Sequence, residues 1–424
     1  MQEIQFPYGR KTLNYNFENE QLLGVLTSHI EEYEPELEGR ALVRKALDEP
    51  VGSQKLSELA QGKQKVVIIA SDHTRPVPSK VIMPEMLADI RKGNPNADVT
   101  ILIATGCHRG TTKDELVDKF GEEIVENEKI YIHDCDDREM LVNIGTLPSG
   151  APCEINKIAV EADLLVAEGF IEPHLFAGFS GGRKSILPGV ASRETVMGNH
   201  CSEFIANKNA RTGILEGNPV HEDMLWAAQA AKLVFIVNVV LNAEKKPIFA
   251  VSGDTVLAHK KGTDFLSKYC GVKALPADIA ITTNGGYPLD QNTYQAAKGM
   301  TAGEATVKKG GVVIMLSESE DGTGGDHFFK VLADSKTVDE AMDKVLARGR
   351  NQTVPDQWQA QIILRVLQKA RVVYVSKIDD ETVEKMHMIP AHSLDEAIQK
   401  AKALVGRDDA TITAIPDGIA VMVR

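Results

Sequence analysis

The chain has 424 residues, enough for two or three domains at about 150 residues per domain. Hydrophobic residues make up 43% and charged residues 25%, the composition of an ordinary globular protein. The formal net charge of −13, without any basic run, disfavours nucleic acid and anionic membrane surfaces as partners. Five widely spaced cysteines with no Cys-x-x-Cys pair argue against a disulfide framework and against a zinc finger.

The sequence also lacks the features of an exported or membrane-spanning chain. Its first residues have no apolar signal core, and no apolar run approaches the ~18 residues that a membrane span requires. We therefore expect a cytoplasmic protein.

Short apolar runs rich in Val and Ile alternate with helical patterns from residue 65 onward. The runs are unbroken rather than alternating, as in strands that helices cover on both faces. Predicted strands span 65–71, 98–104, 129–134, 163–169 and 233–241, with a helix at 79–93 and a hairpin partner for the last strand at 244–254. This βαβ pattern predicts a parallel sheet.

The pattern restarts after a Gly- and Pro-containing stretch at 268–277. Further strands are predicted at 278–285, 310–316, 371–377 and 410–418, and a helix at 393–406. We therefore expect an α/β protein of two Rossmann-like domains, residues 1–272 and 273–424, with an active-site cleft between them.

Polar residues gather directly after the predicted strands of the first domain. Ligands of doubly wound sheets bind beyond the carboxyl ends of the strands, so these loops are candidate sites. Asp72 to Arg75 follow the first strand, His108 follows the second, and His174 follows the fourth. A glycine-rich stretch at 178–185 comes next, and a helical stretch then ends at His200.

The glycine-rich stretch does not match a standard nucleotide motif. Arg183 stands where a P-loop requires the glycine before its lysine, and no Gly-x-Gly-x-x-Gly follows the first strands. We still expect backbone amides of 178–185 to face an anion. Arg75 suits a carboxylate or phosphate, although it also has Asp72 close by as a pairing partner.

Motifs at six separated places, in the same order, resemble the nickel-dependent lactate racemases, and the resemblance covers essentially the whole chain. The motifs are Asp72-x-Thr74-Arg75-Pro76, Thr105-Gly106-x-His108, Glu172-Pro173-His174, Gly181-Gly182-Arg183-Lys184-Ser185, Asn199-His200 and Tyr294-Gln295-x-x-Lys298.

The resemblance implies a nickel pincer nucleotide, a pyridinium mononucleotide that holds nickel through two sulfur atoms and a ring carbon. Lys184 matches the lysine that is covalently linked to it, and His200 matches a nickel ligand. The resemblance also implies cofactor contacts from Asp72, His73, Thr74 and Arg75.

The resemblance further implies that L- and D-lactate are interconverted through pyruvate by reversible hydride transfer. His108 and His174 match the acid–base pair, and Arg75, Gln295 and Lys298 match substrate-binding residues. The residue types suit this chemistry, because histidine exchanges protons near neutrality and soft sulfur donors with imidazole suit nickel(II). A small 2-hydroxy acid and separate cofactor-maturation proteins are the implied partners.

Three alternatives remain open. His108, His174 and His200 suffice in number for a catalytic zinc site, so a zinc hydrolase is one. A non-catalytic sensor of organic acids or nucleotides is another. The third keeps the same cofactor and racemises or epimerises a different 2-hydroxy acid.

Overall fold

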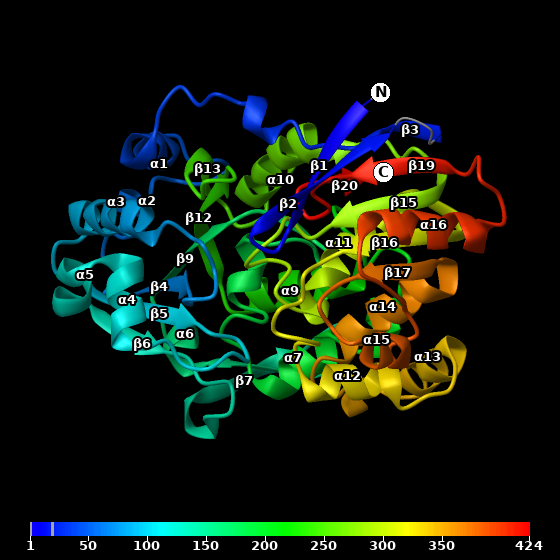
Figure 1. Cartoon of the computed structure of the whole chain (residues 1–424). Coiled ribbons are helices and arrows are strands. Elements are labelled where there is room, and N and C mark those ends of the chain that lie inside the picture. The colour runs from blue at the N-terminus through cyan, green and yellow to red at the C-terminus, as the bar shows by residue number, and fades with distance from the viewer. Residues whose placement is uncertain (1, 18–20) are drawn as a thin grey trace. The chain divides into compact units, whose positions relative to one another are not determined.

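The computed structural model describes residues 2–17 and 21–424 (Figure 1). The chain divides into two compact units, which are described separately below. The first unit comprises residues 30–200 and 207–268. The second comprises residues 269–424, residues 201–206 and the described part of residues 1–29.

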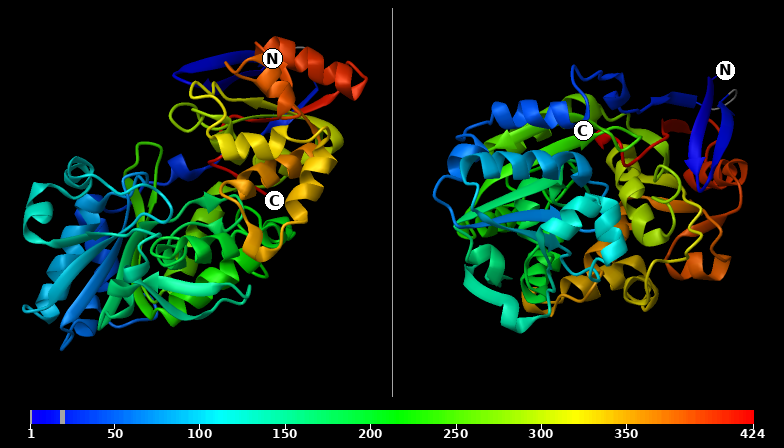
Figure 2. Two further views of the ribbon diagram at one scale, coloured as in Figure 1. Left: turned by 90° about the horizontal axis from the view of Figure 1, so that it is seen from below. Right: turned by 90° about the vertical axis from the view of Figure 1, so that its left-hand side faces the viewer.

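A six-stranded sheet forms the centre of the first unit. Figure 2 gives two further views, in which the strands of this sheet are coloured from blue to green. In spatial order the strands are β13 (Pro247–Gly253), β12 (Leu233–Leu241), β9 (Leu164–Phe170), β4 (Lys65–Ser71), β5 (Asp98–Ala104) and β6 (Lys129–Ile132). Only β13 is antiparallel to its neighbour, which confirms the predicted hairpin at 244–254. The strands predicted at 65–71 and 98–104 have the predicted bounds.

The order of these strands creates a switch point. From β4 the chain builds outward through β5 and β6, and it then returns to the other side of β4 to add β9 and β12. The chain leaves the carboxyl end of β4 toward β5 and leaves the adjacent carboxyl end of β9 toward β12, in the opposite direction across the sheet. In open α/β sheets a crevice opens at such a point, and this is where ligands bind.

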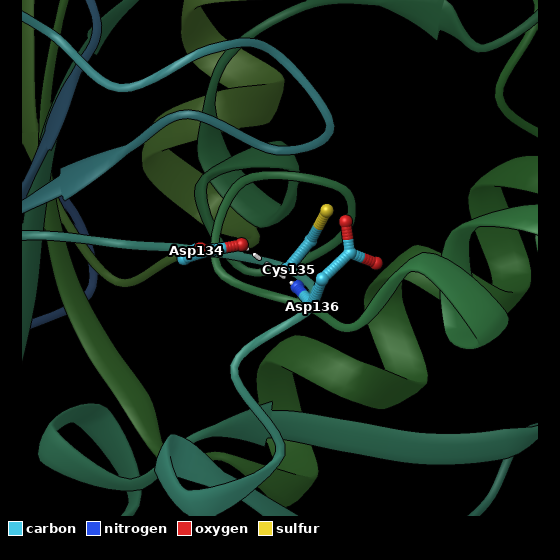
Figure 3. A group of neighbouring side chains, drawn as sticks. All are labelled: Asp134, Cys135 and Asp136. Carbon is cyan, nitrogen blue, oxygen red and sulfur yellow. Dashed lines mark hydrogen bonds between the residues drawn. The ribbon is translucent and has the colours of Figure 1, made fainter.

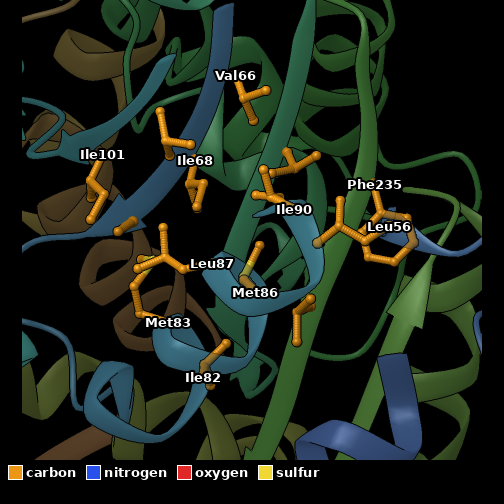
Figure 4. Close-up of a cluster of buried hydrophobic side chains, with 14 of the residues drawn as sticks. Leu56, Val66, Ile68, Ile82, Met83, Met86, Leu87, Ile90, Ile101 and Phe235 are labelled. Carbon is orange, nitrogen blue, oxygen red and sulfur yellow. The ribbon is translucent and has the colours of Figure 1, made fainter. Parts of the chain in front are cut away.

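Apolar side chains on α3 (Ser79–Gly93) pack on one face of this sheet. Figure 4 shows the α3 residues Ile82, Met83, Met86, Leu87 and Ile90 near Val66, Ile68 and Ile101 of the strands. Burial of each such side chain stabilises the fold by about 1.5–3 kcal/mol. The opposite face contacts the 3-10 helix η3 (Gly182–Ser185), which packs against β4, β9 and β12.

The other elements of the first unit connect or flank this sheet. The helices are α1 (Gly39–Asp48), α2 (Leu56–Leu59), α4 (Lys113–Phe120), α5 (Glu122–Asn127), α6 (Lys157–Val160), α7 (Arg193–Asn199), α9 (Pro219–Ala230) and α10 (Leu257–Cys270), whose last two residues lie past the division. Two small antiparallel pairs are β7 (Leu141–Thr146) with β8 (Pro152–Asn156) and β10 (Pro173–His174) with β11 (Gly178–Phe179).

The second unit contains a fully parallel six-stranded sheet. Its spatial order is β18 (Ile389–Ala391), β17 (Arg371–Val375), β16 (Val307–Leu316), β15 (Ala277–Thr283), β19 (Thr411–Ile415) and β3 (Gln21–Val25). The helices are α8 (Ser202–Ala206), α11 (Thr293–Thr306), α12 (Asp326–Ala333), α13 (Val338–Leu346), α14 (Gln357–Lys369), α15 (Asp380–Lys385) and α16 (Leu394–Val405). The predicted strands and the helix at 393–406 lie within a few residues of these bounds.

The division of the chain differs from the predicted boundary at residue 272. The second unit takes β3, which pairs with β19, and the hairpin of β1 (Gln2–Tyr8) and β2 (Lys11–Phe17). Phe6 and Phe17 of this hairpin pack with Ile279 and Ile314 of the second sheet. Burial of these apolar residues explains why the described part of residues 1–29 does not belong to the first unit.

Residues 201–206 also belong to the second unit, because α8 bonds to its helices. The side-chain amide of Gln361 on α14 donates to the Ser202 carbonyl at 2.7 Å. A last pair, β14 (Gly271–Val272) with β20 (Met422–Val423), lies in this unit as well. Across the described residues, none of the helices is both long and apolar enough to cross a bilayer.

Candidate functional site

Three polar loops lie at the switch point of the first unit. The loops start after β4, β5 and β9, which are neighbours in the sheet and parallel, so their carboxyl ends share one edge. Asp72, His108 and His174 therefore come from adjacent strand ends, and their place at one end of the sheet is as the sequence predicts.

His108 and Asp72 form the central pair of these loops. The Nδ1 atom of His108 lies 2.8 Å from Oδ2 of Asp72, whose side chain is only 2% exposed. Beside a buried carboxylate this nitrogen carries the proton and donates it, which leaves Nε2 as the proton acceptor. The His108 ring is 44% exposed, so its Nε2 side is accessible to a ligand. A base oriented by a carboxylate is a common arrangement in acid–base catalysis.

Asp72 is held ionised by its neighbours. Burial alone would raise the pKa of its carboxyl, but hydrogen bonds from His108 and Thr74, with favourable electrostatic interactions with the His108 ring and Arg75, bring the pKa below its ordinary value. The Thr74 hydroxyl donates to Oδ1 of Asp72 at 2.7 Å. Arg75 donates to the Thr74 hydroxyl at 3.2 Å and is exposed, so its predicted alternative role as the direct partner of Asp72 is not what the structure has.

His73 turns toward α4 instead of toward this pair. Its Nδ1 lies 3.1 Å from the Thr111 hydroxyl and 3.7 Å from a Glu115 carboxylate oxygen. His73 is thus bonded to the neighbouring loop, and its predicted contact with a cofactor stays a prediction.

His174 has a different hydrogen-bonding environment from His108. It lies in β10, and its Nδ1 accepts from the Ala177 amide at 3.3 Å. Because an amide only donates, Nδ1 is unprotonated in this arrangement and the ring proton is on Nε2. The Phe176 ring contacts both His174 and His200, with centroid distances of 4.6 and 5.1 Å. Phe176 therefore links the two histidines within one cluster.

His200 ends α7 as its C-terminal cap and is 5% exposed. Burial, together with the nearby Lys184 charge, lowers the pKa of His200 to about 3. The imidazole is therefore neutral at pH 7, the form in which histidine binds a metal. The sequence predicts this role, and the burial of His200 is compatible with it.

Lys184 lies in η3, half-buried, after a turn that requires glycine. Gly181 and Gly182 have φ angles of 77° and 54°, in the left-handed region. Four of the eight amides predicted to face an anion bond within the protein instead, and presentation by the others stays a prediction. The four bonds are Phe179 to Ala177, Ser180 to Glu172, Gly182 to Asn238 and Lys184 to Gly181.

Gln295 and Lys298 belong to the second unit, on the first turns of α11. The Asn292 side chain caps this helix by accepting from the Gln295 amide at 3.0 Å. Residues three apart lie on one side of a helix, so Gln295 and Lys298 are neighbours, both half-buried. Their role with substrate, and the predicted cleft, stay predictions.

The described residues contain one group of three neighbouring potential metal ligands. Asp134, Cys135 and Asp136 bring their ligand atoms within 4.8 Å of one another (Figure 3). These groups already have partners: Asp134 accepts from the Asp136 amide at 2.9 Å, and Asp136 pairs with Arg193 at 2.6 Å. A hydrogen bond with Cys107, followed by burial, raises the pKa of the Cys135 thiol, which disfavours a thiolate ligand.

The three predicted histidines do not form such a group. Within the described residues, His108, His174 and His200 do not bring three ring nitrogens within 4.8 Å of one another. This geometry counts against the zinc hydrolase alternative, whose site needs three ligands around one ion.

Comparison with known proteins gives the family. The model of the lactate racemase N-terminal domain matches residues 8–213, and that of the C-terminal domain matches residues 272–423. A lactate racemase from Thermoanaerobacterium thermosaccharolyticum is 52% identical over 425 residues, with 100% of both chains covered. The chain belongs to the lactate racemase family. A second relative, the lactate racemase of Lactiplantibacillus plantarum, is 51% identical over 425 residues with the same coverage.

Solved structures agree with membership in the lactate racemase family. The lactate racemase apoprotein of Thermoanaerobacterium thermosaccharolyticum superposes with a TM-score of 0.95 over 100% of both chains, at 52% identity. A protein of Thermotoga maritima with 20% identity gives a TM-score of 0.63 over 92% of this chain and 100% of its own, which shows the fold alone. As a member of the lactate racemase family the chain is an isomerase, and the predicted family and α/β fold are confirmed.

The surroundings of Arg183, the residue before Lys184, are not predicted by the sequence. In the sequence Arg183 breaks a P-loop pattern and belongs to the motif at 181–185, but neither observation predicts that it is almost fully buried and contacts His221 and His259. The only local sign of this environment is a charged residue between a glycine and a lysine. The two histidines that contact it lie on α9 and α10, far away in the sequence.

Proposed function

We propose that this chain interconverts L- and D-lactate by moving hydride from Cα and back through pyruvate. The Cα–H of lactate is barely acidic, because its carboxylate cannot delocalise more negative charge. When the hydride leaves with its electron pair, the hydroxyl proton must leave too, and a C=O bond forms. Return of the hydride to the opposite face and of a proton to the oxygen gives the other enantiomer.

The observation that best supports this proposal is the opposite proton placement on His108 and His174. His108 donates through Nδ1 to Asp72 and so accepts a proton at Nε2. His174 accepts through Nδ1 from the Ala177 amide and so carries its proton at Nε2. One histidine is arranged to take the hydroxyl proton and the other to give one, and the roles exchange with the direction of reaction.

The cofactor of this proposal is a nickel pincer nucleotide, which supplies the hydride acceptor and donor when bound. Lys184 is proposed as its covalent attachment point, since a lysine amine is a nucleophile for an activated thiocarboxyl group. His200 is proposed as the nickel ligand, and its buried, neutral imidazole suits that metal better than a hard oxygen-preferring ion. Asp72, His73, Thr74 and Arg75 are proposed to contact the cofactor.

Substrate binding is proposed to use cationic and amide side chains. The exposed Arg75 guanidinium offers a fork that matches a carboxylate, and Gln295 and Lys298 are proposed to hold the substrate as well. Separate maturation proteins are proposed to load the cofactor. The cytoplasmic location stays a prediction from the sequence.

The test uses L-lactate deuterated at Cα and protein produced together with cofactor-maturation proteins, without added NAD. D-lactate that keeps the deuterium supports return of the same hydride. D-lactate that has lost the deuterium overturns the hydride route in favour of proton abstraction. If protein that carries nickel and a Lys184 adduct forms no D-lactate, the substrate is another 2-hydroxy acid, which a panel with malate, 2-hydroxybutyrate and 2-hydroxyglutarate identifies.

A further inference from the structure

A charged side chain occupies the interior of the loop that joins His174 to Lys184. Arg183 is 1% exposed, and burial lowers the pKa of its guanidinium to about 9, so it keeps its charge at pH 7. The groups that accept its hydrogen bonds are carbonyl oxygens and the His221 imidazole. A buried charge is stable only where such hydrogen bonds replace its hydration, so the fold depends on these bonds to Arg183.

The guanidinium bonds to three carbonyl groups of the loop around it. Its Nη2 donates to the Ala177 carbonyl at 2.7 Å, and its Nη1 donates to those of Phe179 at 2.8 Å and Gly181 at 3.3 Å. Ala177 is also the residue whose amide bonds to His174. The Arg183 side chain therefore reaches from the residue beside Lys184 to the hydrogen-bond partner of His174.

Two histidines from helices fix the position of the guanidinium. His221 of α9 accepts from Nε of Arg183 at 3.0 Å, and His259 of α10 lies 3.2 Å from Nη1. The same Nε2 atom of His259 lies 2.8 Å from the Ser180 carbonyl and donates its proton there, so it packs against Nη1 of Arg183 without accepting a hydrogen bond from it. A Cβ atom at Gly182 would lie 2.9 Å from the His259 ring, so the glycine permits this close packing.

We propose that Arg183, held by His221 and His259, is the positioning residue that fixes His174 and Lys184 in one rigid loop. This inference rests on the proposed roles of His174 and Lys184. A planar guanidinium holds five N–H donors in a fixed fork, whereas a lysine ammonium has three donors that rotate on a flexible stem. Loss of the guanidinium geometry leaves carbonyl groups unbonded and lets the loop ends shift. A shift near 1 Å costs up to ~100-fold in rate.

The test compares Arg183→Lys, His221→Leu and His221→Asn in protein produced with maturation proteins. The variants are compared by kcat per molecule that carries the Lys184 adduct, with the adduct counted by intact mass. We expect kcat to fall about 10- to 100-fold in Arg183→Lys and His221→Leu with KM nearly unchanged. His221→Asn should recover most of the rate, because its amide oxygen replaces the Nδ1 acceptor.

A second readout needs no cofactor. Hydrogen exchange of peptides covering 174–184 should become faster in the apo forms of Arg183→Lys and His221→Leu, but not in His221→Asn. Asp89→Asn is the matched control, since Asp89 is a buried group of α3 that accepts from Ser57 and Arg44, away from this loop. It should lower stability without changing exchange at 174–184 or kcat per adduct.

The outcomes separate this inference from the proposed function. If wild-type protein carries no adduct or does not racemise lactate, the proposed function itself is wrong. If wild type is active and His221→Leu keeps its kcat per adduct and its exchange rates, Arg183 is a structural residue only and the inference is wrong. His221 is half-buried on a helix, so its variants should fold even where Arg183→Lys does not.

Discussion

The two histidines proposed to exchange the proton are held in opposite ways. His108 lies in an accessible loop and bonds to the charged carboxylate of Asp72. His174 lies in a loop with a buried guanidinium at its centre, and its Nδ1 accepts from an uncharged backbone amide. The first loop therefore determines which nitrogen of His108 carries the proton. The second loop instead determines where His174 and Lys184 lie.

This contrast fits what each loop is proposed to hold. A base must gain and lose a proton, and a carboxylate beside it stabilises the protonated form without blocking access. An attachment point for a bulky group must stay in place through every cycle, which buried hydrogen bonds achieve better than exposed ion pairs. Three predictions test this difference between the loop of His108 and the loop of His174.

The largest effect is expected from Asp72→Asn. Asparagine cannot stabilise a protonated His108, and its amide hydrogens favour the wrong imidazole tautomer. We expect kcat in both directions to fall about 100-fold or more, with the Lys184 adduct still present. Rates are measured by chiral chromatography of lactate, and adducts by intact mass.

Asp89→Asn serves as the control for this substitution, because it exchanges the same groups at another buried site of the first unit. A kcat within twofold of wild type in Asp72→Asn would show that the carboxylate does not control the tautomer and protonation of His108. The contrast between the two loops would then disappear.

An intermediate effect is expected on stability as the pH falls. Burial, with the Arg183 charge, lowers the pKa of both His221 and His259 to about 3. Unfolding returns each to its ordinary value near 6.5, so the unfolded chain binds more protons between these limits. Stability is therefore full above pH 6.5 and declines as the pH falls toward 3, by at most ~1.4 kcal/mol per pH unit for each histidine.

His259→Gln should reduce this slope, because glutamine keeps a donor for the Ser180 carbonyl and does not titrate. Urea unfolding of the apoprotein at pH 7, 6 and 5 measures the slope. Equal slopes in the variant and in wild type would mean that His259 is not held neutral.

The smallest effect is expected from Thr112→Ala, at the start of α4 beside the accessible loop. The Thr112 hydroxyl accepts from the Glu115 amide at 3.3 Å, and the Glu115 carboxylate accepts from the Thr112 amide at 2.8 Å. Loss of this cap should lower the free energy of unfolding by about 1 kcal/mol. The kcat should stay within about twofold, and a tenfold loss would show that α4 also positions His108.

Much of the fold follows from local sequence patterns. The strands β4 and β5 and the helix α3 begin and end at the predicted residues, because unbroken Val- and Ile-rich runs and a helical apolar spacing decide them. The βαβ pattern also predicts that the loops of Asp72, His108 and His174 lie at one end of the sheet, whereas the adjacency of β9 to β4 comes from the structure.

The N-terminal hairpin was missed although the sequence contains its signal. Ile4 and Phe6, then Leu13, Tyr15 and Phe17, alternate with polar residues on either side of Gly9-Arg10. Alternation of this kind predicts a half-buried hairpin. Its partner sheet lies more than 250 residues away in the sequence, so no local pattern assigns it to the second unit.

The environment of Arg183 is beyond local patterns for the same reason. Its partners His221 and His259 come from two helices separated from it by 38 and 76 residues. Nothing near them in the sequence distinguishes these histidines from surface residues. The protonation of His108 and His174 depends likewise on single contacts, which only coordinates supply.

The pairing of β3 with β19 has a consequence for synthesis of the chain. The edge strand β3 has its hydrogen-bonding partner about 390 residues later in the sequence. At 5–20 residues per second, roughly 20–80 s pass before the ribosome has made that partner. Residues 30–200 and 207–268, which form the first unit, are complete within that interval, while β3 still lacks its partner strand. Early proteolysis or chaperone capture should therefore fall on the N-terminal segment, and release of the full-length chain should end that exposure.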